Sequence, residues 1–279
     1  DFVGGANLST LGDILVNAQL SSTGGDLILN ADNDSDGTGG FRVSDPGQVN
    51  ADGVLTITGT DLAASAGTSG DGIVVIADAG GNPQLVATGA INLDANTGVN
   101  ANAFMSILGD IESSFAGNAI VLGDAAEIQL AGTHTASDAN GDIDVESEMV
   151  LVGDAQFDGN DASFQNTIND DGLPGTDSNL TVTASGNVTL GGAAGGGTAL
   201  NSTDVDGSDI VLHGVTTTGA QTYTGSGTIT LNSNYTTTNS DWRAEGNVTL
   251  GSASTDIQTG AGAGNIDVTG TLDGASDFE

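Results

Sequence analysis

The sequence predicts an all-β chain folded as a parallel β-helix, or β-solenoid. The clearest sign lies in residues 207–250, where a Gly- or Asn-containing turn leads three times into a short alternating strand. The turns begin at Gly207, Gly227 and Gly246, about 20 residues apart. The residues between them are mostly Thr, Gly, Asn and Ser and lack the 3.6-residue apolar period of a helix. Strands that recur at this interval indicate solenoid coils of roughly 19 residues.

The rest of the chain repeats this pattern. Short alternating strands are predicted from GDILVNA, which begins at Gly12, to GNIDVTG, which begins at Gly264. In GNVTL, Val188 and Leu190 share one face and Thr189 lies on the other. Glycine is frequent and proline rare, with 45 and 3 residues, as expected for a chain that turns a corner every few residues.

We expect one continuous solenoid over residues 1–279, with about 14 coils. A weak boundary near residue 150 is left open, because the repeats are less regular before it. The longest irregular stretch is 158–178, which we interpret as a long loop. The chain begins at Asp1 without a signal peptide, so we expect a mature or excised piece.

The charge excludes several classes of partner. Asp and Glu number 37 against two basic residues, Arg42 and Arg243, which gives a net charge of −35. Nucleic acid and anionic membrane surfaces need a basic patch, and no apolar run is long enough to span a bilayer. There is no cysteine, so disulfides and thiolate metal sites are excluded. Divalent cations or salt would relieve the self-repulsion.

The sharpest local motif is DNDSDG, in which Asp32, Asp34 and Asp36 alternate before Gly37. Such carboxylates can converge on one calcium ion, and the glycine permits the tight turn. The twelfth position is Val43, so the motif is not an EF-hand, and a solvated acidic turn is the alternative. Two weaker acidic clusters follow: Asp138, Asn140, Asp142 and Asp144, and then Asn169, Asp170, Asp171 and Asp177 in the long stretch.

A catalytic role is not expected. His134 and His213 are the only histidines, and we interpret His213, which ends a predicted strand before Gly214, as a surface or corner residue. A polysaccharide lyase on this fold would need Arg42 or Arg243 as its base. A hydrolase would need only paired carboxylates, whose abundance here makes any chosen pair uninformative. Trp242 with Tyr223 and Tyr235 could form a small carbohydrate-binding patch, or could pack in the core.

Three stretches carry a family resemblance, one of them SNLTVTASGNVTLGGAAGGGTAL (178–200), which looks like the preceding part of the repeat quoted next. VTTTGAQTYTGSGTITLNSNYTTT (215–238), followed by WRAEGNVTLGS, resembles a repeat of large filamentous-haemagglutinin-like surface proteins of Gram-negative bacteria. STGGDLILNADNDSDGTGGFRV near the start looks like another recurring module of these proteins. The resemblance implies a right-handed parallel β-helix, export to the cell surface, and a role in adhesion or aggregation.

These observations together predict a structural and adhesive segment of a bacterial cell-surface adhesin or extracellular filament, stabilised by calcium. Partners would be other solenoid units, end to end or within a longer fibre. The first alternative is a module that binds a glycan or another partner through its loops, with Asp170, Asp171, Asp177 and Trp242 as candidates. The second is a polysaccharide-degrading enzyme.

Overall fold

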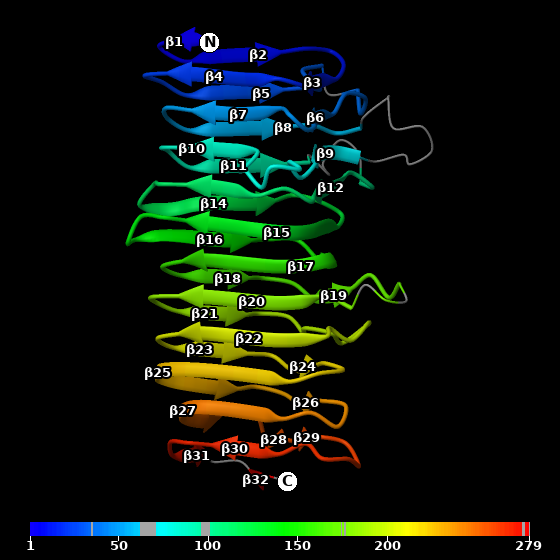
Figure 1. The fold of residues 1–279 in the computed structure, drawn as a ribbon, viewed down its shortest axis with the longest axis vertical. Helices are drawn as coiled ribbons and strands as arrows, with labels where there is room; N and C mark the ends of the chain where they lie inside the picture. Colours follow the sequence, from blue (N-terminus) through cyan, green and yellow to red (C-terminus); the bar gives the residue numbers. More distant parts are fainter. Residues whose placement is uncertain are drawn as a thin grey trace. The chain divides into compact units, whose positions relative to one another are not determined.

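The computed structural model describes residues 1–34, 36–61, 71–95, 101–173, 175, 177–274 and 277–278. These residues form strands and turns without any helix, so this part of the chain has no helix that could cross a membrane. Parallel strands stack as a β-solenoid of about 11 turns, with equivalent strands about 23 residues apart (Figure 1). The prediction of an all-β solenoid is confirmed.

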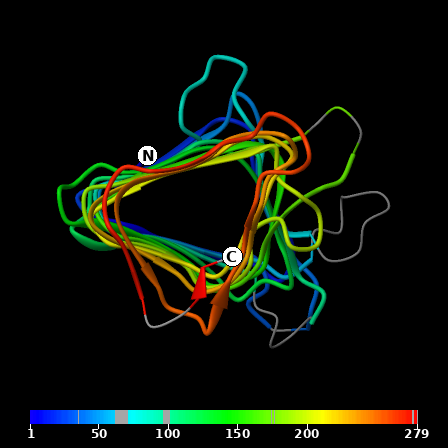
Figure 2. The same ribbon diagram turned by 90° about the horizontal axis from the view of Figure 1, so that it is seen from below.

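The chain divides into two compact units, Asp1–Glu148 and Met149–Glu279. The division falls close to residue 150, where the sequence becomes more regular. Within each unit a coil has three sides, and an end-on view shows this three-sided course (Figure 2). Each side is a parallel sheet that gains one strand per coil.

In the amino-terminal unit, the first side contains β1 (Phe2–Val3), β4 (Gln19–Thr23), β7 (Gln48–Ala51), β10 (Leu85–Ala87), β13 (Ile111–Ser113) and the second half of β15 (Ile128–Ala136). The second side contains β2 (Ala6–Ser9), β5 (Leu27–Asn30), β8 (Leu55–Thr58), β11 (Ile91–Asp94), β14 (Gly117–Gly123) and β16 (Gly141–Val145). The third side contains β3 (Ile14–Val16), β6 (Phe41–Val43), β9 (Asp71–Val75), β12 (Phe104–Ile107) and the first half of β15.

In the carboxy-terminal unit, the first side contains the second half of β17 (Met149–Gly159), β20 (Asn179–Ala184), β22 (Ser202–Gly207), β25 (Gln221–Leu231), β27 (Trp242–Leu250) and β30 (Ile266–Val268). The second side contains β18 (Ala162–Phe164), β21 (Val188–Leu190), β23 (Ile210–Leu212), the second halves of β25 and β27, and β31 (Leu272–Gly274). The remaining short strands are β19 (Ile168–Asp170), β24 (Val215–Thr216), β26 (Tyr235–Thr236), β28 (Ser254–Thr255), β29 (Ile257–Gln258) and β32 (Asp277–Phe278).

The core is built from apolar residues stacked in register on successive coils. In the amino-terminal unit one such column consists of Leu27, Leu55, Ile91, Ile120 and Ile143, all buried. In the carboxy-terminal unit the equivalent column consists of Val188, Ile210, Ile229 and Val248, also buried. Burial of each such side chain contributes about 1.5–3 kcal/mol. The period-two pattern of the sequence therefore predicts correctly which residues face inward.

Coil length differs from the predicted value over much of the chain. Ile210 pairs with Ile229, 19 positions later, and Ile229 pairs with Val248, again 19 positions later. In the amino-terminal unit, however, Leu55 pairs with Ile91, 36 positions later. The longer coils carry extended corner segments, such as residues 76–84 between β9 and β10. Coils of 19 residues occur only in the most regular stretch, and the corner segments lengthen the others. The chain therefore has about 11 turns, not the expected 14.

Glycine is required at one corner of the amino-terminal unit because successive coils approach closely there. The Gly89 N–H donates to the Gly53 carbonyl oxygen at 2.8 Å. A Cβ on Gly89 would lie 2.5 Å from the Gly53 carbonyl carbon, closer than real side chains come. No atom would lie within 4 Å of a Cβ on Gly12, at another turn of the same unit.

We therefore expect Gly89→Ala to destabilise the protein and Gly12→Ala to leave its stability nearly unchanged. The overpacked corner should cost about 1–3 kcal/mol, because the backbone of the neighbouring coil must move. Urea unfolding followed by circular dichroism measures the two variants against the wild type. Equal midpoints for the two variants would show that the close approach of the coils at Gly89 does not affect the free energy of unfolding.

Candidate functional site

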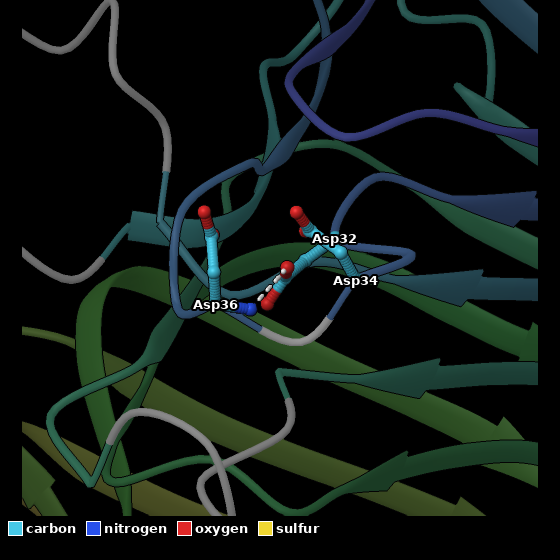
Figure 3. Close-up of side chains that lie close together, drawn as sticks. All are labelled: Asp32, Asp34 and Asp36. Carbon is cyan, nitrogen blue, oxygen red and sulfur yellow. Dashed lines mark hydrogen bonds between the residues drawn. The ribbon is translucent and has the colours of Figure 1, made fainter.

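Asp32, Asp34 and Asp36 come together in the turn that follows β5, as the sequence predicts (Figure 3). One carboxylate oxygen from each lies within 4.8 Å of the others. Among the described residues, this is the one group of three or more His, Cys, Asp or Glu side chains placed closely enough to hold a metal ion. Asp34 and Asp36 are exposed, whereas Asp32 is only 3 % exposed.

The buried carboxylate of Asp32 holds this turn together by accepting hydrogen bonds. Its Oδ1 accepts the Asp36 N–H at 3.2 Å, and its Oδ2 accepts the Gly37 N–H at 3.3 Å. The Thr60 hydroxyl, from the next coil, donates to the same Oδ2 at 2.8 Å. A buried carboxylate is stable here because these donors replace its hydration. The turn therefore presents two exposed carboxylates over one anchored carboxylate.

The group offers only carboxylate oxygens, the ligand type that hard cations prefer. The Thr38 hydroxyl and backbone N–H both donate to Asp36 and hold the pKa of that carboxyl below its ordinary value. Calcium prefers such carboxylate oxygens in flexible turns. Val43, the twelfth position of the motif, is buried in β6 and provides no ligand. The exclusion of an EF-hand from the sequence agrees with this geometry.

The second predicted cluster does not converge. Asp138 caps a turn by accepting the Asn140 N–H at 2.9 Å. Asp142 and Asp144 lie on the outward face of β16, opposite Asn118 and Val121 of the neighbouring strand. Their carboxylates do not join Asp138 in a group close enough for a metal ion. The sequence spacing placed these residues near each other along the chain but on different parts of a coil.

The stretch 158–178, predicted as a long loop, contains regular strands: the end of β17, then β18 and β19. Irregular chain follows β19 at residues 171–173, 175 and 177–178, which we call segment 171–178; Pro174 and Thr176 lie outside the described residues. Asp170 is buried and accepts the Gly172 N–H at 2.9 Å and the Ser178 N–H at 2.8 Å, so it ties the two ends of this segment together. Asp170 is thus a structural anchor. Asp177 is exposed and Asp171 partly exposed, as a binding role would require.

Trp242 is not available for a ligand. Its side chain is fully buried in the carboxy-terminal unit, with its ring centroid 5.8 Å from that of Tyr223 and 6.2 Å from that of Tyr235. The Tyr223 hydroxyl donates to Gln221 Oε1 at 3.0 Å, and the Tyr235 hydroxyl to the Leu212 carbonyl oxygen at 3.1 Å. The core interpretation of these rings is correct, and the proposed carbohydrate patch at Trp242 is wrong.

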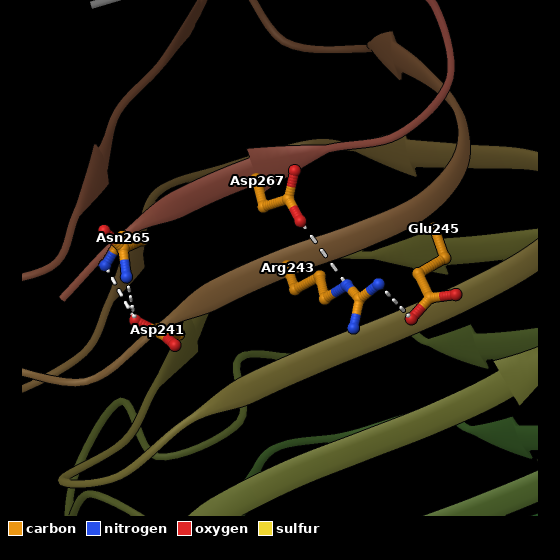
Figure 4. A network of polar contacts seen from close by, with 5 residues as sticks. All are labelled: Asp241, Arg243, Glu245, Asn265 and Asp267. Carbon is orange, nitrogen blue, oxygen red and sulfur yellow. Dashed lines mark hydrogen bonds and ion pairs between the residues drawn. The ribbon is translucent and has the colours of Figure 1, made fainter.

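The basic residues are held in local contacts. Arg42 Nε donates to the Ser44 hydroxyl at 2.9 Å. Arg243 lies between two acids: its Nη2 is 3.0 Å from Glu245 Oε1 and its Nε is 3.6 Å from Asp267 Oδ2 (Figure 4). Arg243 thus balances the charge of one acid on its own strand, β27, and of one on the neighbouring strand, β30. An arginine between two carboxylates is poorly placed to act as the base of a lyase, because both neighbours stabilise its protonated form.

Sequence reasoning missed a recurrent role of the aspartates, in which an aspartate on one coil accepts a backbone N–H of the next coil. Asp26 Oδ1 accepts the Val54 N–H at 2.9 Å, and Asp110 Oδ1 accepts the Thr133 N–H at 2.7 Å. Further examples of the same contact are Asp13 with Gly40, Asp154 with Asn179, Asp161 with Asn187, Asp209 with Thr228, and Asp241 with Asn265. Hydrogen bonds to a charged acceptor contribute about 1.5–3 kcal/mol each. The recurrence of Asp or Asn immediately before a predicted strand was the signal that could have revealed them.

Outward carboxylates on paired strands do not lie directly opposite each other. In the carboxy-terminal unit, one outward column reads Asp158, Thr183, Asp206, Thr224 and Glu245 on successive strands. Threonine separates each carboxylate from the next, so like charges lie about 10 Å apart rather than about 5 Å. Among the described strand pairs, no carboxylate lies directly opposite another. Beside this column, burial raises the pKa of Asp204, and the charges of Asp206 and Glu245 add to the shift.

Comparison with known proteins yields no match to a protein-family model, a curated protein or a solved structure. The features of this chain that bear on function are therefore its fold and its own side chains. These are the acidic turn at Asp32, segment 171–178 and the outward columns of the coils.

The burial of His134 predicts how the stability of the protein depends on pH. Its imidazole is fully buried on β15, and desolvation lowers its pKa from 6.5 to about 4, although the Ala131 backbone favours the charged form. The unfolded chain therefore binds the proton first, and stability contributed by the neutral ring is lost as pH falls from 6.5 towards 4. We expect His134→Leu to lose less stability than the wild type over this range, by up to about 3 kcal/mol. Urea midpoints at pH 7, 5 and 4 measure the difference; parallel curves for both proteins would contradict it.

Proposed function

We propose that this chain is a structural and adhesive β-solenoid segment of a bacterial cell-surface adhesin or extracellular filament. The observation that carries the proposal is the construction of the coils. Each coil is joined to the next by parallel strands on its sides and by carboxylate caps at its corners. Such stacking makes a long, repetitive body in which every repeat depends on its neighbours. This design suits a spacer that carries load and displays loops.

The surface chemistry supports an extracellular setting for this role. The outward columns carry Thr, Asn, Asp and Glu, and the chain has 37 acidic residues and two basic ones. A strongly acidic surface repels other copies side by side and keeps the protein soluble at low salt. The resemblance of residues 215–238 to repeats of filamentous-haemagglutinin-like surface proteins favours the same setting.

The acidic turn supports a role for calcium in this function. A cation held by Asp32, Asp34 and Asp36 would cross-brace the segment between β5 and β6, because Asp32 is already tied to Thr60 of the next coil. Outside a bacterial cell, calcium is commonly available at concentrations that weak carboxylate sites can use. The ion would also offset part of the local negative charge.

A second candidate function is recognition of a glycan or another partner through segment 171–178. One observation favours it: Asp170 holds the N–H groups of Gly172 and Ser178, and Leu173 between them is 59 % exposed. An anchored loop with an exposed apolar side chain is a common form of binding element on a rigid scaffold. Asp171 and Asp177 would supply hydrogen-bond acceptors for hydroxyl groups.

We expect millimolar calcium to raise the melting temperature by a few degrees, because it binds the folded state preferentially. Asp34→Asn should remove this increment, since it takes a charge from the group without touching the buried Asp32. Asp138→Asn is the matched control, because Asp138 belongs to no such group. Differential scanning calorimetry at constant ionic strength gives the readout. If calcium raised the melting temperature equally in both variants, the rise would come from general charge screening and not from an ion bound at Asp32, Asp34 and Asp36.

The adhesive role is tested with beads coated with the 279-residue chain and applied to host-cell monolayers and to a glycan array. We expect the coated beads to bind and Leu173→Ala to reduce binding about tenfold, as loss of a central contact does. Leu15→Ala is the control, because Leu15 is similarly exposed but lies on β3. Beads that fail to bind any surface would overturn the adhesive part of the proposal. Equal binding by the two variants would move recognition away from segment 171–178.

A further inference from the structure

Aspartate stands immediately before proline once in the sequence, at Asp45–Pro46. The two residues lie in the corner 44–47, which joins β6 to β7, and both are exposed. The Gly47 N–H donates to the Ser44 carbonyl oxygen at 2.5 Å, so this corner is a closed turn with Asp45 and Pro46 at its centre. The peptide bond between them is therefore open to water.

The Asp45 carboxyl has another carboxyl as its partner. The corner 76–84 of the next coil follows the same course as the corner 44–47, because β6 pairs with β9 and β7 pairs with β10. Asp78 in this second corner shares a hydrogen bond with Asp45. An ionised carboxylate accepts hydrogen bonds and cannot donate them. One of the two acids must therefore carry a proton in this contact.

The surroundings place this proton on Asp45. Asp78 accepts the Gly80 N–H at 3.0 Å and the Asn82 N–H at 3.3 Å, and the Asn82 side-chain amide also donates to it. These donors hold the pKa of Asp78 below its ordinary value. The hydrogen bond with Asp78, partial desolvation and the charge of Asp78 raise the pKa of Asp45, although the Ala79 N–H favours its charged form. Among the described residues, no other titratable group acts on either carboxyl.

We propose that the chain cleaves its own Asp45–Pro46 peptide bond in mildly acidic surroundings, with the Asp45 carboxyl as the nucleophile and Asp78 as the residue that keeps this carboxyl protonated. This activity goes beyond the proposed structural and adhesive function and does not depend on it. Asp78 acts through the Asp45 carboxyl and not on the bond that breaks, so it is a positioning residue.

The reaction consumes only water. A side-chain oxygen of Asp45 attacks the carbonyl carbon of the same residue and closes a five-membered cyclic anhydride. The bond from this carbon to the Pro46 nitrogen breaks, and the proton of the Asp45 carboxyl moves to that nitrogen, which leaves as a secondary amine. Water then opens the anhydride, so one chain ends in Asp45 and the other begins at Pro46. Nucleophile and carbonyl belong to one residue, so the reaction needs no encounter between separate groups.

Proline after the aspartate removes a competing reaction. After most other residues pairs of this kind can form a succinimide, because the backbone nitrogen that follows the aspartate attacks its side chain and leaves the chain intact. The Pro46 nitrogen carries no hydrogen and cannot form this ring. Attack of the Asp45 carboxyl on its own carbonyl carbon is then the reaction that remains.

Cleavage nicks the coil without releasing a fragment. β6 pairs with β3 and β9, and β7 pairs with β4 and β10. Both strands keep these hydrogen bonds when the corner between them is cut, so both new chain ends stay in place. The pieces 1–45 and 46–279 therefore separate only when the protein unfolds.

Mass spectrometry of the full chain after incubation at pH 5 tests the proposal. We expect denaturing separation to yield fragments 1–45 and 46–279, whose summed mass exceeds that of the intact chain by one water. An ordinary aspartate is only about one-tenth protonated at pH 5, so the contact with Asp78 can speed cleavage by up to about tenfold. Asp78→Asn should therefore slow cleavage about fivefold at pH 5. Asp138→Asn, the same change at an aspartate that does not contact Asp45, is the matched control and should leave the rate unchanged.

The pH profile separates this activity from the ordinary chemical lability of the bond. In concentrated urea the wild type keeps the Asp45–Pro46 bond but loses the contact with Asp78, so at pH 5 it should be cleaved as slowly as folded Asp78→Asn. At pH 3 in urea, where an ordinary aspartate is mostly protonated, the wild type and Asp78→Asn should be cleaved at the same rate. Asp45→Asn, which has no carboxyl group, should not be cleaved at pH 5.

Three results would overturn the inference. The first is a folded wild-type chain that stays intact at pH 5. The second is an equal rate for the folded wild type and folded Asp78→Asn at pH 5. The third is a wild-type chain that is cleaved at pH 5 as fast in urea as in the folded state.

Discussion

The structure depends on the spacing of about 4.8 Å between strands of successive coils, because every side chain then has a neighbour from the equivalent position one coil away. Inside, the stacking of like on like buries columns such as Leu27, Leu55 and Ile91. At the tight corner, where Gly53 and Gly89 touch, it leaves no room for a Cβ. Outside, no carboxylate lies directly opposite another on the described strand pairs, and threonine separates Asp158 from Asp206. One distance thus selects residues on both faces of the sheet.

The acidic composition follows from this construction more than from any ligand. A coil that turns a corner leaves a backbone N–H without a strand partner, and an aspartate on the preceding coil accepts it, as Asp26 and Asp209 do. A carboxylate is suited to this task because it accepts hydrogen bonds and never donates when ionised. Asp32 applies the same chemistry at a turn, with two neighbouring carboxylates left exposed. The number of acids is therefore weak evidence for metal binding, and their convergence is the stronger evidence.

The fold could be predicted from the sequence because its signals are local. Alternation in GNVTL and glycine before each strand report on a single coil, and the coils repeat. Coil length was predicted correctly between Ile210 and Val248 and incorrectly around Leu55, because corner segments such as 76–84 have no periodic pattern. The acidic turn at Asp32 was recognised because its three carboxylates lie within five residues. Trp242 and Asp170 could not be placed, since an aromatic ring or a carboxylate on an alternating strand is inward or outward according to register, and register depends on the neighbouring coils.

A solenoid of this kind separates construction from recognition. Any residue in a column is constrained by two neighbours, so a binding group placed there disturbs the coils on both sides. Segments that leave the column escape this constraint. The described parts of the turn after β5 and of the segment after β19 do so, and each is held by one buried aspartate, Asp32 or Asp170. Recognition is therefore expected where a column is interrupted, and the regular stretch between Gly207 and Leu250 supplies the unit of construction.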